Sequence, residues 1–221
     1  MFTDKTKINI FFSLYLQDIV TVIIAVVCLT LSLVFPAVGI VQMLTKNIFF
    51  LIIVPVLYIK YIRKENLKDF GLNLRNKKIG IIGGIIMLAV LALISFAYTQ
   101  FAGFQDNYQL PGYVVDHFWY FVFYELVFVN FFLFIYDFFF RGFILFSLTP
   151  KFGLWAVLAQ AVIFWSTLLL TKNFTWALAP TIILAPASGI LTYKSKSFIY
   201  SYTASIIFMI FLDAYLIHSI K

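Results

Sequence analysis

Cysteine, histidine and charge are all scarce in this chain. It has one cysteine, Cys28, and two histidines, His117 and His218, and only 11% of its 221 residues are charged. A lone cysteine excludes an internal disulfide and a thiolate metal cluster. Cys28 lies in an apolar run, where we expect a buried, inert thiol. So little charge excludes a soluble domain, which could not hide the remaining apolar surface.

What the chain does have is hydrophobic sequence, which makes up 63% of its residues, with a mean hydropathy of +1.02. These values predict a polytopic bundle of transmembrane helices, all-α, that forms a single domain over residues 1–221. The first apolar stretch, Ile8–Leu44, is longer than the core of a signal peptide, so we expect it to be retained. The net charge of +7 comes from bases that crowd into loops beside the spans, so we expect no nucleic acid partner.

Seven apolar segments are long enough to be read as spans. We expect the first within Ile8–Leu44, kinked by Pro36 at its distal end. The other six are expected at about Asn47–Ile62, Ile79–Phe101, Phe118–Leu148, Gly153–Leu170, Phe174–Thr192 and Ser197–Ile217. An odd number of crossings places the C-terminal end of the chain on the side of the membrane opposite the N-terminus. The terminal Lys221 fits that side poorly, so either the count is off by one or an eighth helix follows.

Loop charge predicts the orientation. The loop 60–78 contains seven lysines and arginines, whereas the loop 102–117 contains none. Basic residues favour the cytoplasmic side, so we expect loop 60–78 and the N-terminus in the cytoplasm and loop 102–117 outside.

An acid and a base lie four residues apart inside the fourth predicted span, in the segment 136–142 (YDFFFRG). Asp137 and Arg141 would share one helix face. Charge at membrane depth is costly and marks a pathway, a catalytic centre or a paired structural lock. As a structural pair, Asp137 and Arg141 would hold the bundle together near its cytoplasmic end. As a binding site, Arg141 would meet the carboxylate of a lipid or peptide.

Other motifs stand in order around this segment. The basic loop ends in Lys68–Leu72 (KDFGL), and the next span has glycines at 80, 83 and 84. Phe152–Trp155 (FGLW) and Gly189–Tyr193 (GILTY) follow later. Together, over roughly residues 60–213, these features resemble the CPBP family of intramembrane CAAX-processing and bacteriocin-processing proteases, also called the Abi family. The resemblance implies a CPBP-like helical bundle.

The resemblance also implies where the ligands of a catalytic metal would be. Family enzymes carry Glu-Glu-x-x-x-Arg, then Phe-x-x-x-His, then His-x-x-x-Asn or Asp. The corresponding positions in this chain are Tyr136, Asp137, Arg141, Leu168, Ser205 and Met209. Only Asp137 is a carboxylate, and neither histidine lies in these segments. A catalytic zinc site needs about three His or carboxylate ligands, so we expect a pseudoprotease with no metal and no other cofactor.

A bundle that lacks these ligands but keeps the fold would act by binding another protein. The chain also resembles one degenerate member of the family, and that resemblance implies a membrane scaffold in the plasma membrane of a Gram-positive bacterium, with a role in cell-wall metabolism. It further implies that the partner is a membrane-anchored peptidoglycan hydrolase, a glucosaminidase, held and oriented beside this bundle. A divergent intramembrane protease using Asp137 with Tyr136 or Ser205 is the alternative. A lipid-carrier binding protein, with Arg141 meeting a phosphate, is the second alternative.

Aromatic residues are expected at the outer surface. Tyr108 and Tyr113 in the outer loop suit a protein contact. Trp119 and Tyr120 begin the fourth span, where an aromatic belt at the membrane interface is expected. The same rings could contact a partner or membrane lipid.

Overall fold

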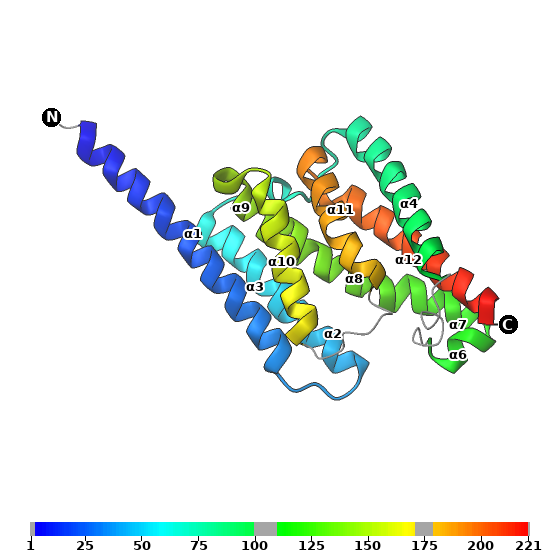
Figure 1. Cartoon of the computed structure of the whole chain (residues 1–221). Helices are drawn as coiled ribbons and strands as arrows, with labels where there is room; N and C mark the ends of the chain where they lie inside the picture. The colour runs from blue at the N-terminus through cyan, green and yellow to red at the C-terminus, as the bar shows by residue number, and fades with distance from the viewer. Residues whose placement is uncertain (1–2, 100–109, 171–178, 221) are drawn as a thin grey trace.

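The computed structural model describes residues 3–99, 110–170 and 179–220, and within these ranges every regular element is a helix (Figure 1). The prediction of an all-helical chain is confirmed for this part. Tyr108, the first half of the loop 102–117 and the start of the sixth predicted span lie outside the described residues.

The helices follow one another in chain order. The first is α1 (Thr3–Val34). A second long helix, Ile40–Arg63, is built from α2 (Ile40–Ile48), the π-helical η1 (Phe49–Ile53), α3 (Val54–Leu57) and the π-helical η2 (Tyr58–Arg63). After the short 3-10 turn η3 (Leu67–Phe70) comes α4 (Lys77–Thr99).

The second half begins with the short α6 (Gly112–Asp116). A third long helix, Phe118–Phe152, combines α7 (Phe118–Phe123), η4 (Tyr124–Val129), α8 (Asn130–Tyr136), η5 (Asp137–Ile144) and α9 (Leu145–Phe152). The chain then continues through α10 (Trp155–Leu170), α11 (Ala179–Ser195) and α12 (Phe198–Ile220).

Among the described residues, four helices are long and apolar enough to cross a membrane: Ile40–Arg63, Lys77–Ala97, Phe118–Phe152 and Phe198–His218. Ile19–Val34 and Trp155–Leu170 are apolar but shorter. A membrane protein is therefore indicated, and seven crossings stay a prediction.

The boundary between the first two predicted spans was wrong. We expected one segment over Ile8–Leu44 with a kink at Pro36, but α1 ends at Val34 and a new helix begins at Ile40. Gly39 has a φ of 85°, which only glycine adopts without strain, and the side chain of Gln42 accepts a 2.7 Å hydrogen bond from the backbone N–H of Val38. Pro36 and Gly39 together therefore end one helix and start the next.

The segment η5 lies at the centre of the bundle, and all eight of its residues are buried. It contacts η1, α10, α11 and α12. On one side Phe139, Phe140 and Phe143 pack with Tyr58 and residues of α1. A second apolar core joins α4, α11 and α12. Figure 1 shows α1 along one flank of the molecule, with its N-terminal end extending away, and α4 on the other.

Close packing of α4 depends on glycine. A Cβ atom at Gly80 would lie 2.3 Å from the ring of Tyr200 on α12, whereas one at Gly84 would lie 3.9 Å from Ala204. Small residues of this kind let transmembrane helices approach closely.

Gly80→Val is expected to push α4 away from α12 and to destabilise the bundle by about 1–3 kcal/mol, the usual cost of overpacking. Thermal unfolding of the purified protein in mild detergent measures this. Gly84→Ala is the matched control and should leave the midpoint nearly unchanged. Equal midpoints for Gly80→Val and wild type would contradict the close contact.

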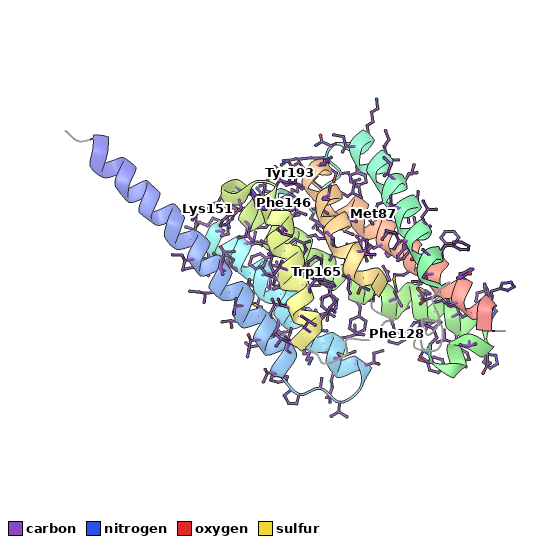
Figure 2. The ribbon with its side chains drawn as sticks, in the orientation of Figure 1. Met87, Phe128, Phe146, Lys151, Trp165 and Tyr193 are labelled. Atoms are coloured by element: carbon purple, nitrogen blue, oxygen red, sulfur yellow. The ribbon has the colours of Figure 1, made fainter. Side chains whose placement is uncertain are left out.

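Pro186 lies inside α11 and interrupts the backbone hydrogen bonding of this helix. Proline has no N–H, so the carbonyl of Ile182, four residues earlier, loses its helical donor. The indole N–H of Trp165 on α10 donates to this carbonyl at 3.0 Å (Figure 2). Beside it, the side-chain amide of Gln160 donates to the carbonyl of Ala185, also at 3.0 Å. A neighbouring helix thus supplies the donor that proline removes.

Candidate functional site

The charged pair of the sequence motif lies at the start of η5. The guanidinium of Arg141 forms an ion pair with the carboxylate of Asp137, and the two side chains are 5% and 0% exposed. The Nε–H of Arg141 has no hydrogen-bond acceptor among the described residues. A π-helical segment, which is rare and often found at functional sites, carries the pair.

A cavity of about 420 Å³ opens beside this pair. Its wall is mostly apolar and comes from the long helix Phe118–Phe152, α2, α10, α11 and α12. Because the lining extends from Tyr124 to Arg141, the cavity follows this helix for about 25 Å, at ~1.5 Å per residue. We call it the inner cavity. Its volume is within the usual range for small-molecule sites, ~300–1,000 Å³.

Five of the six positions singled out by the motif line the inner cavity: Tyr136, Asp137, Arg141, Leu168 and Met209. They come from three different helices, so only the fold brings them together. Ser205 does not line it. Its hydroxyl is fully buried and donates a 2.8 Å hydrogen bond to the carbonyl of Ser201, one turn earlier on α12.

The donor set around the inner cavity does not fit a catalytic zinc ion. Asp137 is its one carboxylate, and no histidine lines it. Elsewhere in the described part of the chain, no three His, Cys, Asp or Glu side chains come together as possible metal ligands. Tyr136 is the other ionisable side chain at the position of a family ligand, and its ring packs on Phe140 and Phe164. What the site offers chemically is an apolar chamber with a paired charge in its wall.

Other buried polar groups join helices. Glu125 on η4 and Asp213 on α12 are 2% and 1% exposed, and their carboxyl groups interact. Asn130 receives a hydrogen bond from the hydroxyl of Tyr202, also on α12. The side-chain amide of Gln160 joins α10 to α11 through the backbone carbonyl of Ala185. Interhelical bonds of this type are common in membrane bundles.

The aromatic residues predicted at the surface are exposed where they are described. Tyr113, Trp119 and Tyr120 are 56%, 78% and 56% exposed. Tyr113 and Tyr120 line a second cavity of about 750 Å³, together with Asp116, His117 and parts of α7 and η4. We call this the outer cavity.

Sequence reasoning missed the outer cavity and part of the inner one. Asp116 and His117 could have been identified as polar residues next to the aromatic segment 118–124. The sequence of that segment does not predict a concave surface. Ile40, Met43 and Thr181 line the inner cavity, and nothing in their local sequence distinguishes them from other membrane residues.

Comparison with models of protein families, with curated proteins and with solved structures found no match to this chain. The class defined by fold and site is therefore a helical membrane protein with a buried ion pair beside an apolar cavity.

Proposed function

We propose that this chain is a catalytically inactive, CPBP-like membrane scaffold. It binds and orients a membrane-anchored peptidoglycan hydrolase in the plasma membrane of a Gram-positive bacterium. Within the CPBP family, the sequence most resembles the transmembrane domain of a staphylococcal lysostaphin-resistance protein, and the choice of a glucosaminidase as partner follows from that resemblance.

One observation carries the proposal. Of the residues that motif spacing places at family ligand positions, all but Ser205 line a single cavity, yet Leu168 and Met209 have replaced the family ligands there, and Asp137 is paired with Arg141. A cavity lined by these positions without a set of metal ligands supports a chamber of the family type that lacks the groups needed to activate water. A retained fold without these side chains supports a role in binding.

The buried ion pair fits such a role. Asp137 and Arg141 lie in the most enclosed helix of the bundle, where a charge is tolerated only when it is paired. The pairing therefore leaves neither charge buried without a partner where η5 packs against its neighbours. A scaffold needs this arrangement to be fixed, because it orients the partner without taking part in its chemistry.

Two measurements on the purified full chain separate the scaffold from the divergent protease. We expect no stoichiometric zinc by elemental analysis and no cleavage of a transmembrane peptide. Cleavage that is lost in Asp137→Asn, or one zinc per chain, would overturn the scaffold proposal.

The inner cavity favours one second candidate, a protein that binds a lipid carrier. Its apolar wall could hold a hydrocarbon chain, and the free Nε–H of Arg141 could meet a phosphate. In this case an isoprenyl phosphate would bind the wild-type protein and bind Arg141→Met at least about tenfold more weakly. The scaffold proposal expects no such difference.

A further inference from the structure

The outer cavity lies at the end of the bundle opposite the basic loop 60–78. It is formed where α6 meets α7 at His117, whose extended backbone turns the chain between the two helices. Its mouth is lined by Tyr113, Asp116, His117 and Tyr120, and its floor by Phe123, Tyr124 and Phe128. Figure 2 labels Phe128, which lines both cavities.

The aromatic residues at the start of the helix Phe118–Phe152 favour a position for the mouth of the outer cavity at the level of lipid headgroups. The span Phe118–Phe152 begins here, and its first residues Phe118 and Trp119 are 69% and 78% exposed. Trp and Tyr gather at this depth because their rings are apolar and their edges polar. Phe128 is eight residues further along the helix than Tyr120, or about 12 Å deeper, within the hydrocarbon layer.

The rings at the mouth stand as perpendicular walls. Tyr113 meets Tyr120 at 86° with ring centroids 6.2 Å apart, and His117 meets Tyr120 at 69° and 5.5 Å. Ring faces carry partial negative charge, so walls set at right angles suit a positive group between them. Perpendicular aromatic walls of this kind recognise quaternary ammonium ions.

The charge at the mouth of the outer cavity also favours a positively charged ligand. Asp116 supplies a carboxylate, and the described residues that line the cavity include neither a lysine nor an arginine. Among the described residues, Asp116 has no ion-pair partner. An anionic headgroup would be repelled here, whereas an ammonium group would be attracted both by the carboxylate and by the rings.

We infer that the outer cavity binds a lipid whose headgroup carries an ammonium group. The ammonium lies among Tyr113, Tyr120 and Asp116, and the first part of the hydrocarbon chain lies against Phe123 and Phe128. Depth and charge together favour a lipid over a soluble ligand, because the floor is apolar and lies below the headgroup level. This site does not depend on the proposed scaffold function.

Native mass spectrometry of the purified full chain in a neutral detergent tests the inference, with phosphatidylcholine and phosphatidylglycerol of equal chain length as probes. We expect phosphatidylcholine to bind about tenfold or more tightly than phosphatidylglycerol, because the headgroups differ in positive charge. Tetramethylammonium, the headgroup cation alone, should compete with phosphatidylcholine.

Two kinds of variant locate the site. Asp116→Asn and Tyr120→Ala are each expected to weaken phosphatidylcholine binding about two- to fivefold, from loss of a charge or a ring face. Tyr120→Phe should keep the affinity, because the ring and not the hydroxyl makes the contact. Trp119→Leu is the matched control, since Trp119 is exposed on the same helix but does not line the cavity. Thermal unfolding confirms that each variant is folded.

Equal affinity for the two lipids would overturn the inference. So would unchanged phosphatidylcholine binding in both Asp116→Asn and Tyr120→Ala. Binding of tetramethylammonium without binding of phosphatidylcholine would show a soluble ammonium ion as the ligand and would overturn the assignment to lipid.

Discussion

Arg141→Met is expected to destabilise the protein by about 3–5 kcal/mol, the usual cost of breaking a buried ion pair. The substitution leaves the carboxylate of Asp137 fully buried, with its partner cation gone. Reversible unfolding in mixed micelles measures the loss. Asp137→Leu is expected to have a similar effect, because it leaves the guanidinium of Arg141 buried without a partner.

The double variant Asp137→Leu/Arg141→Met distinguishes two explanations of this loss: that each charge needs its partner, or that the fold needs the charges themselves. Replacing both partners of a buried ion pair with apolar residues is often neutral or stabilising, and the inner cavity beside the pair leaves room for the larger leucine, so the double variant should be close to wild type. The exposed pair Arg75–Asp69, at 3.5 Å, is the control, and Arg75→Met there should cost less than about 1 kcal/mol. If the double variant were as unstable as the sum of the two single variants, the two charges would act independently, and the pairing would be contradicted.

Trp165→Phe is expected to cost about 1–3 kcal/mol, because it keeps an aromatic ring at the site but removes the indole N–H. The indole of Trp165 is the donor to the carbonyl of Ile182, which Pro186 has deprived of its helical partner. Inside a membrane no water replaces the lost bond. The same unfolding assay measures the effect.

Pro186→Ala should rescue this loss. Alanine restores an N–H that can bond to Ile182, so Trp165→Phe is expected to cost clearly less in a Pro186→Ala background than in wild type. This coupling between two helices distinguishes the hydrogen bond from simple packing of the ring. Ser166→Ala is the neighbouring control, because its hydroxyl bonds within its own helix, to the carbonyl of Val162. An equal cost of Trp165→Phe in both backgrounds would contradict the assigned role of the indole.

Much of the helical order could be predicted from the sequence, because long apolar runs in a membrane leave the backbone little choice but helix. The break at residues 35–39 was harder to place. Pro36 was visible, but a proline alone does not distinguish a kink from the end of a helix, and the left-handed conformation at Gly39 decides it. The donor from Trp165 to Ile182 could not be predicted, since it depends on how α10 and α11 pack.

Only part of the candidate site could be predicted, and that part came from motif spacing and not from hydrophobicity. Motif spacing singled out Tyr136, Leu168 and Met209, and the fold brings all three to one cavity. Ser205, placed by the same spacing, does not line this cavity, and its hydroxyl bonds to the carbonyl of Ser201 within α12. The outer cavity depends on α6 folding back beside α7, and periodicity in an almost uniformly apolar chain carries no such information.

The most direct test of the scaffold account is capture of its partner by the charge-free double variant. Full-length protein is purified in mild detergent from cells of the bacterium that makes it, and the co-purifying membrane-anchored glucosaminidase is quantified. A scaffold needs the fold but not the carboxylate, so Asp137→Leu/Arg141→Met should capture as much glucosaminidase as wild type. The destabilised Arg141→Met should capture less. Absence of a cell-wall hydrolase from the wild-type complex, or its loss in a stably folded double variant, would contradict the account.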